Sequence, residues 1–158
     1  MENNYPKVAI MGGGSFATAI AKIVMENVPN IIWYMRRDDQ IAEFKRVGHN
    51  PSYLSAVSFD LDRIKFTSKI NVAVAEADIL FFATPSPFLK SHLKKLRRRI
   101  DSKIIVIGTY FTGVGIVKRL SEKYENILLI DIYPHLEKLL YTDKLTLSNE
   151  KSTKSWIF

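Results

Sequence analysis

The chain has 158 residues and contains no cysteine, which excludes disulfides and zinc sites built from thiolates. Histidine is scarce as well: His49, His92 and His135 stand far apart, without the spacing of metal ligands, so we expect no metal site. No apolar run approaches the ~20 residues of a membrane-spanning helix, and the first residues lack the pattern of a signal peptide. These absences favour a cytoplasmic protein without a membrane span.

The overall composition is that of a folded domain. Hydrophobic residues make up 47% of the chain and charged residues 25%, as in globular proteins and unlike disordered ones. A chain of this length suits one domain, which buries about 70% of the surface of its unfolded state. We expect a single Rossmann-type domain over residues 1–141, followed by a C-terminal tail over 142–158.

A basic stretch between residues 90 and 103 contains much of the net charge of +7. One interpretation is a patch that binds nucleic acid or a membrane surface. The other is the solvated face of a helix, because apolar residues recur at helical spacing from Leu89 to Ile100. We favour the solvated face and expect no nucleic-acid partner, since no aromatic residues alternate with the basic ones. The basic residues are Lys90, Lys94, Lys95, Arg97, Arg98, Arg99 and Lys103.

Strand and helix patterns alternate along the chain. The expected strands are 7–11, 31–35, 64–67, 79–83, 104–107 and 127–132. The expected helices are 15–27, 38–47, 71–76, 86–100 and 114–124. This alternation predicts an α/β fold, with a doubly wound, mostly parallel Rossmann-type sheet and helices on both faces.

The most specific motif lies between the first expected strand and helix. Residues 8–17 read Val-Ala-Ile-Met-Gly-Gly-Gly-Ser-Phe-Ala, the G-x-G-x-x-A form of the dinucleotide fingerprint. Gly12 permits a tight turn, Gly14 lets the backbone approach a pyrophosphate, and Ala17 allows close packing of the helix on the strand. The free N–H groups at the helix start receive the anion. The sequence therefore predicts a site for a nicotinamide dinucleotide.

The residues after the second expected strand bear on which dinucleotide is bound. An acidic residue there typically binds the ribose 2′-hydroxyl of NAD, whereas an arginine suits the 2′-phosphate of NADP. Here Arg36 and Arg37 come first, and Asp38 and Asp39 follow. We favour a binding role for Arg36, which lies 24 residues beyond Gly12; the alternative is that all four residues begin a helix. For Arg37 the two interpretations stay open.

Residues 5–103 resemble the N-terminal cofactor domain of bacterial-type, NAD(P)-dependent glycerol-3-phosphate dehydrogenase. The resemblance rests on four stretches that occur in the order of the family. They are the Gly-x-Gly-Ser-aromatic opening at 12–21, the end of the second strand at 33–38, the Asn-Pro-x-Tyr-Leu loop at 49–54 and the Ala-x-Pro-Ser motif at 81–86.

The resemblance implies NADP or NAD as cofactor and a phosphorylated three-carbon substrate, sn-glycerol 3-phosphate, which the family oxidises to dihydroxyacetone phosphate. By position it also implies that five residues contact the dinucleotide. Core packing is the alternative for the two aromatic residues among them. The five residues are Ser15, Phe16, Arg36, Arg37 and Tyr53.

After Lys103 the chain departs from the expected pattern. The family continues into Ser-x-x-Lys-Gly, whose lysine lies beside the nicotinamide, but no lysine occurs here near Tyr110 and Phe111. Lys118 lies well inside the next expected helix and is a poor substitute. Without such a cation, no obvious group stabilises the oxyanion that forms as hydride reaches or leaves a secondary carbon.

We therefore name no catalytic residue. One hypothesis is a cofactor-binding module that is catalytically incomplete, and another is an enzyme completed by a partner subunit. The oligomeric state stays open, with a homo-oligomer as one way to cover an exposed apolar surface.

A second glycine turn lies within residues 104–141. Gly108, Gly113 and Gly115 follow an expected strand, and Asp131 lies 23 residues beyond Gly108, the spacing of a ribose-binding acid. This pattern allows a site for a nucleotide or S-adenosylmethionine. Because the glycine spacing is not standard, we favour a tight strand-to-helix turn without a ligand. The two parts also resemble pieces of different Rossmann-type proteins joined near Lys103, by engineering, natural fusion or a frameshift.

Overall fold

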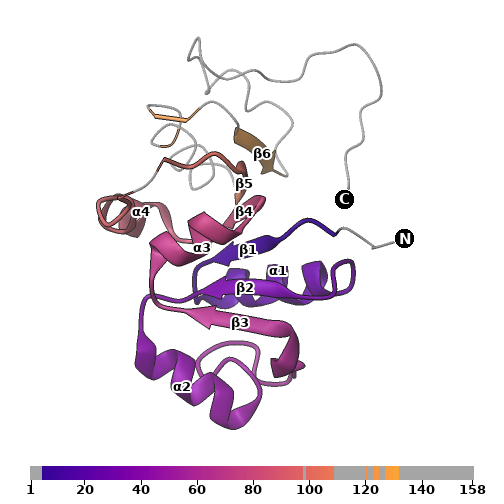
Figure 1. The fold of residues 1–158 in the computed structure, drawn as a ribbon. Coiled ribbons are helices and arrows are strands. Elements are labelled where there is room, and N and C mark those ends of the chain that lie inside the picture. Colours follow the sequence, from indigo (N-terminus) through magenta and orange to yellow (C-terminus); the bar gives the residue numbers. More distant parts are fainter. Residues whose placement is uncertain (1–4, 98, 109–119, 121–122, 125–126, 132–158) are drawn as a thin grey trace.

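The computed structural model describes residues 5–97, 99–108, 120, 123–124 and 127–131. Its centre is a parallel sheet of six strands in the order β3-β2-β1-β4-β5-β6, which can be followed upward in Figure 1. The strands are β1 (Val8–Met11), β2 (Ile31–Tyr34), β3 (Ile64–Thr67), β4 (Ile79–Phe82), β5 (Lys103–Gly108) and β6 (Ile127–Asp131). This order is that of a doubly wound Rossmann-type sheet, so the predicted fold class is confirmed.

Strands β1 and β2 are hydrophobic throughout because both of their faces are covered. Every residue of these two strands is buried. A strand buried on both faces needs a continuous apolar run instead of alternation. Val8 lies opposite Ile31 of β2 and Ile79 of β4, so the carboxyl ends of the three strands are level.

Helices cover the two faces of the sheet in pairs. The helices are α1 (Ser15–Met25), α2 (Asp38–Val47), α3 (Ile70–Glu76) and α4 (Ser86–Leu93), with a 3-10 turn, η1 (Leu61–Arg63). On one face, α1 and α2 pack in a core that includes Trp33 and Phe44. On the other face, α3 and α4 pack in a core that includes Tyr34 and Leu89. In Figure 1, α3 lies in front of the strands and α1 behind them.

The expectation of one helix over 86–100 is wrong in its second half, because α4 ends at Leu93. The side chain of Asn71 in α3 binds the chain just beyond. Its Nδ2 donates to the carbonyl oxygen of Lys95 at 2.9 Å, and its Oδ1 accepts from the amide of Arg97 at 2.8 Å. These bonds replace the helical bonds that the two backbone groups would make.

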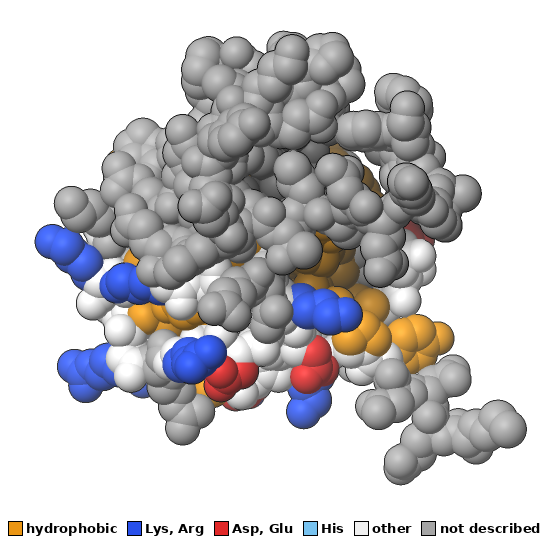
Figure 2. Space-filling view, turned by 90° about the horizontal axis from the view of Figure 1, so that it is seen from above, with side chains coloured by type: hydrophobic (Ala, Val, Ile, Leu, Met, Phe, Trp, Pro, Cys, Tyr) orange, Lys and Arg blue, Asp and Glu red, His pale blue; other side chains and the backbone are white. Residues whose placement is uncertain are grey.

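The basic stretch lies over an apolar layer. Its basic side chains that the structure describes are exposed, whereas Leu89 and Ile100 are buried. On the face seen in Figure 2, basic side chains stand apart from one another, with acidic side chains beside some of them. This arrangement agrees with a solvated face. No helix in the described residues is long and apolar enough to cross a membrane.

The C-terminal part of the chain is described only in places. Strand β6 agrees with the strand expected near 127–132. The helix expected over 114–124 lies mostly outside the described residues, and Leu120 within it is helical and buried. The tail over 142–158 lies wholly outside, so the division at 141 stays a prediction.

Candidate functional site

The strand order reverses between β1 and β4. The chain runs from β1 to β2 and β3 on one side, and then returns to β4 on the other side of β1. In doubly wound sheets, a crevice for ligands forms at such a point, beyond the carboxyl ends of the strands. Here Gly12 follows β1 and Ala83 follows β4, and the amide of Ala83 donates to the carbonyl oxygen of Met11 at 3.1 Å. The glycine turn therefore lies at the switch point of the sheet.

Gly12 is the residue at which the chain leaves β1. Its φ is +143°, a conformation that residues with a Cβ rarely adopt. A Cβ added there would lie 2.8 Å from the carbonyl oxygen of Ala83 and 3.3 Å from Oγ1 of Thr84. Glycine is therefore required both by the backbone conformation and by the close approach of the segment after β4.

Gly14 and Ala17 lie in different surroundings. Gly14 is the N-cap residue of α1, and a Cβ added to it would meet nothing within 4 Å. Ala17, in the first turn of α1, is fully buried at 0% exposure. The structure thus leaves open space at Gly14 and packs Ala17 into the core.

Side chains from other elements bind the carbonyl groups of Gly12 and Gly13. The indole Nε1 of Trp33 in β2 donates to the carbonyl oxygen of Gly12 at 2.7 Å. The carbonyl oxygen of Gly13 accepts from Nε2 of Gln40 in α2 at 2.8 Å and from Nδ2 of Asn50 at 3.2 Å. Both carbonyl groups are therefore bound by side chains of the protein.

The carbonyl groups at the two ends of the turn are bound in the same way. Oγ1 of Thr84 donates to the carbonyl oxygen of Met11 at 2.8 Å. Oγ1 of Thr18 donates to the carbonyl oxygen of Gly14 at 2.9 Å, and it accepts from Nδ2 of Asn50 at 2.7 Å. Every carbonyl from Met11 to Gly14 thus accepts a side-chain hydrogen bond.

The N–H groups of this turn are arranged differently. Within the described part of the chain, the amides of Gly13, Gly14, Ser15 and Phe16 donate to no acceptor. The first turn of α1 also contains no acidic side chain. Free N–H groups at a helix start, together with the helix dipole, favour an anion. The turn can therefore bind phosphate oxygens through its backbone.

Arg36 and Arg37 stand where the chain leaves β2, and both are exposed. Arg37 is the N-cap residue of α2, and its Nε lies 3.8 Å from Oδ1 of Asp39. The amide of Gly12 donates to the carbonyl oxygen of Tyr34 at 3.0 Å. The segment that contains the two arginines therefore begins next to the glycine turn.

His92 of α4 packs against the end of β2 on the opposite face. Its side chain is 8% exposed, and its ring meets that of Tyr34 edge-on with centroids 5.7 Å apart. Its Nδ1 has no hydrogen-bond partner in the described residues. Burial lowers the pKa of His92, and the charges of Arg36 and Lys95 lower it further. Burial raises the pKa of the Tyr34 hydroxyl, while the charge of Arg36 lowers it.

Three aromatic rings, in α1, after Asn50 and in α4, are open to solvent. Phe16 is 41% exposed and Tyr53 45%, so the alternative that both are core residues is wrong. Tyr53 follows Asn50, whose side chain binds the Gly13 carbonyl. Phe88, near the start of α4, is 57% exposed and was not singled out from the sequence.

Sequence reasoning also missed the donors that bind the turn. Trp33 and Asn50 lie inside stretches that resemble the family, but their roles as hydrogen-bond donors depend on contacts 21 and 37 residues away along the chain. Gln40 lies outside those stretches, and no local pattern marks it. A search for polar residues after β2 that can reach the turn would have suggested it.

The second glycine turn is only partly described. Gly108 ends β5 and lies opposite Asp131 in β6. Outside the described residues are Tyr110, Phe111, Gly113, Gly115 and Lys118. In the described part, no group of three or more His, Asp or Glu side chains could hold a metal ion.

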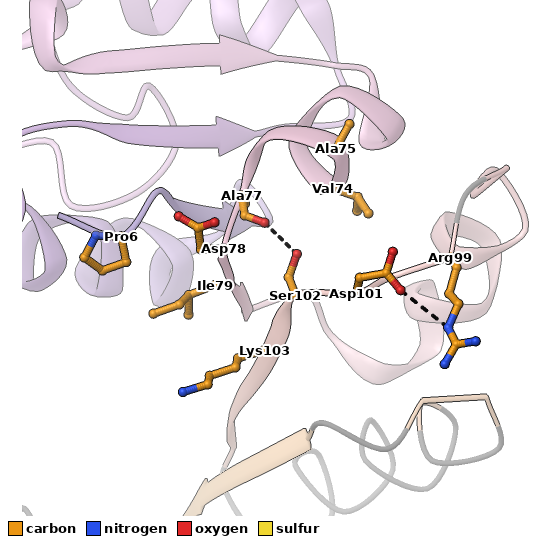
Figure 3. Close-up of a pocket in the computed structure, with 10 residues that line it drawn as sticks. All are labelled: Pro6, Val74, Ala75, Ala77, Asp78, Ile79, Arg99, Asp101, Ser102 and Lys103. Carbon is orange, nitrogen blue, oxygen red and sulfur yellow. Dashed lines mark hydrogen bonds and ion pairs between the residues drawn. The ribbon is translucent and has the colours of Figure 1, made fainter. Parts of the chain in front are cut away.

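A cavity of about 710 Å³ lies at the other edge of the sheet, near the amino ends of β4 and β5. Figure 3 shows Ser102 donating to the carbonyl oxygen of Ala77, and Arg99 paired with Asp101 beside it. Asp78 of this cavity accepts from the amide of Lys7 at 2.8 Å. The cavity is separate from the glycine turn, because parallel strands place their amino and carboxyl ends at opposite edges.

A sequence model described as the N-terminus of NAD-dependent glycerol-3-phosphate dehydrogenase matches residues 7–134. The chain belongs to this family. It is 33% identical over 120 residues to the glycerol-3-phosphate dehydrogenase of Ectopseudomonas mendocina, over 76% of this chain and 35% of the relative. It is 32% identical over 129 residues to that of Staphylococcus haemolyticus, over 79% and 38%. The chain thus spans about a third of the length of these curated relatives.

Solved glycerol-3-phosphate dehydrogenases share the fold. The enzyme of Saccharomyces cerevisiae matches 80% of this chain and 41% of its own, with a TM-score of 0.63 and 20% identity. The enzyme of Coxiella burnetii matches 80% of this chain and 40% of its own, with a TM-score of 0.59 and 17% identity. At such identities the likeness shows a common fold.

The family match corrects one boundary. It extends to residue 134, so the expectation that the resemblance ends at Lys103 is wrong. The match therefore includes β6, which pairs in parallel with β5 in the same sheet. Residues 7–134 thus form the N-terminal NAD-binding domain of the glycerol-3-phosphate dehydrogenase family, whose cofactor is NAD or NADP.

Proposed function

We propose that the chain binds the pyrophosphate of NADP(H) or NAD(H) at the glycine turn between β1 and α1. The strongest support is the contrast between the two kinds of backbone group in the turn. Its carbonyl groups bind protein side chains, while the amides that follow donate to no acceptor among the described residues. Such an array is complementary to phosphate oxygens and not to a cation. The turn residues of the proposed site are Gly12, Gly14, Ser15, Phe16 and Ala17.

We place the ribose end of the cofactor at Arg36, with Arg37 beside it. Arg36 is exposed at the end of β2, next to the turn, and a guanidinium suits a 2′-phosphate. The exposed rings of Phe16 and Tyr53 offer flat apolar surfaces for the nucleotide. Arg37 is close to Asp39, which leaves Arg36 as the main ligand in this proposal.

The activity of the whole protein is a further proposal, since the match covers only 35% of the relative named glycerol-3-phosphate dehydrogenase. The substrate class is a phosphorylated three-carbon alcohol. In its oxidation, hydride moves from the secondary carbon to the nicotinamide and the hydroxyl proton goes to a base. Because residues 110–111 offer no lysine to stabilise the oxyanion, the 158-residue chain binds the cofactor without turnover unless a second copy or a partner subunit completes the site.

Calorimetric titration of the chain with NADPH, NADH and S-adenosylmethionine tests the binding proposal. We expect both dinucleotides to bind and S-adenosylmethionine to fail. A folded chain without affinity for either dinucleotide would end the proposal. Reduction of NADP by purified chain with glycerol 3-phosphate would overturn the claim of incomplete catalysis.

Arg36→Asp tests the ribose end. The change removes the guanidinium and puts a carboxylate near the proposed 2′-phosphate, so NADPH affinity should fall at least about ten-fold more than NADH affinity. Arg99→Asp is the matched control, because it makes the same charge change at the opposite edge of the sheet. Equal losses for the two cofactors would remove Arg36 from this role.

A further inference from the structure

We propose that Gln40 is a positioning residue of the cofactor site, which fixes the orientation of the Gly14 amide by holding the carbonyl group of Gly13. This inference rests on the proposed binding of a pyrophosphate at the glycine turn. It assigns to α2 a part in phosphate binding, in addition to the arginines that precede it.

The geometry of Gln40 and Gly13 supports this role. Nε2 of Gln40 donates to the carbonyl oxygen of Gly13 at 2.8 Å, a shorter contact than the 3.2 Å from Nδ2 of Asn50. A Cβ added to Gly13 would lie 2.8 Å from Oε1 of Gln40 and 3.2 Å from its Nε2. The amide group of Gln40 therefore rests against the backbone of Gly13. A side chain at Gly13 would displace the end of the Gln40 side chain from this position.

Holding the carbonyl of Gly13 also sets the direction of the next amide. A peptide unit is planar, so the carbonyl of Gly13 and the N–H of Gly14 point in opposite directions from one rigid plane. With that carbonyl bound by the side chains of Gln40 and Asn50, the N–H of Gly14 points away from these two side chains. Without Gln40, the longer contact from Asn50 would be the one bond from a described side chain that still holds the Gly13 carbonyl.

Gln40 also connects two parts of the proposed site. It lies in the first turn of α2, four residues after Arg36, so one short segment holds both the proposed ligand of the ribose phosphate and the donor to the turn. A ligand with a pyrophosphate should depend on Gln40, whereas a ligand with only the ribose phosphate should not.

The test compares NADP⁺ with adenosine 2′-monophosphate, which lacks the pyrophosphate, by calorimetry on the full chain. Gln40→Met keeps the length and helix propensity of the side chain and removes the donor. We expect NADP⁺ to bind about five-fold more weakly or worse, the loss typical of one net hydrogen bond, with adenosine 2′-monophosphate within about two-fold. Gln40→Ala is the second variant and should show the same difference between the ligands.

Ala42→Gly is the matched control, because Ala42 is exposed on α2 and glycine weakens the helix without touching the turn. This variant should change the affinities for NADP⁺ and adenosine 2′-monophosphate by the same factor. Equal losses for both ligands, unchanged NADP⁺ affinity in both Gln40 variants, or the same difference in Ala42→Gly would each overturn the role of Gln40. If the parent chain binds no dinucleotide, the proposed function itself is wrong, a result distinct from these.

Discussion

Gly12 and Gly14 are both fingerprint glycines, but their surroundings give them different tasks. A side chain at Gly12 would meet Ala83 and would need a φ of +143°. A side chain at Gly14 would extend into open space from an ordinary φ of −88°. The first glycine is needed to fold the turn, and the second keeps the approach to the turn clear.

Gly12→Ala and Gly14→Ala should therefore separate stability from binding. We expect Gly12→Ala to lower the free energy of unfolding by about 2 kcal/mol or more, through strain and contact with Ala83. Gly14→Ala should change it by less than about 0.5 kcal/mol, yet weaken NADH and NADPH strongly. Urea unfolding and calorimetry measure the two effects. A Gly14→Ala chain with native affinity would contradict the proposed path of the pyrophosphate.

His92 makes stability depend on pH. Its pKa is lowered by burial and by the charges of Arg36 and Lys95, so the unfolded chain binds a proton more readily than the folded one. The free energy of unfolding should therefore be unaffected by His92 above about pH 6.5, the ordinary pKa of histidine, and it should fall as the pH drops below this value. His92→Phe, which keeps a ring against Tyr34, should lose less stability than the parent between about pH 7.5 and pH 5.5. Urea midpoints at the two pH values decide this, and parallel losses in both chains would contradict it.

Local pattern was enough to predict the residues that lie on the turn itself. Gly12, Gly14 and Ala17 follow from spacing, because each requirement concerns the residue's own backbone or size. Trp33 and Gln40 could not be predicted in the same way, since their donors reach carbonyl groups 21 and 27 residues earlier in the chain. These two hydrogen bonds form only after β2 and α2 have packed beside the turn.

At the scale of elements, the sequence predicted strands more closely than the end of α4. Strands β1, β2 and β4 are short apolar runs, as expected in the middle of the sheet, whereas the edge strand β3 reads Ile-Lys-Phe-Thr. The apolar spacing through Ile100 predicted a longer helix, but the side chain of Asn71 binds the backbone of Lys95 and Arg97 instead. Ile100 remains buried without being helical. The spacing of the apolar residues therefore predicted correctly that Ile100 is buried, but it predicted a helix where the backbone is not helical.

Asn71→Ala should release the segment after α4. The variant loses two hydrogen bonds at exposed backbone groups, so we expect the free energy of unfolding to fall by about 1 kcal/mol. Asn71→Asp is the comparison, because it keeps the acceptor for the amide of Arg97 and loses the donor to Lys95. Its loss in urea unfolding should be the smaller one, and an Ala variant as stable as the parent would show that the contact is unimportant.

For the whole molecule, the strand order places the glycine turn and the arginine segment at one edge of the sheet. That placement follows from alternation and the right-handed crossover, so the sequence predicted it before any contact was known. The extent of the family match was not predicted correctly, because the glycines after β5 depart from the motif while β6 still joins the sheet.

The net charge of +7 should affect the two cofactors unequally. NADPH carries an additional phosphate, so the attraction of a basic protein for it is stronger and is screened more by salt. Raising the salt concentration from about 50 mM to about 500 mM should weaken NADPH more than NADH in calorimetry. Arg36→Asp should reduce this difference, and equal salt dependence in the parent chain would contradict a ligand role for the arginines.

Because Trp33 is bound to the carbonyl of Gly12, its fluorescence can report cofactor binding at the turn. The chain has two tryptophans, Trp33 and Trp156, and the indole of Trp33 is buried with its Nε1 on the carbonyl of the first fingerprint glycine. When NADH or NADPH is bound with its pyrophosphate at this turn, its reduced nicotinamide would accept excitation energy from that indole and quench its fluorescence. In a Trp156→Phe chain the remaining emission comes from Trp33 alone, so cofactor binding can be followed without a label.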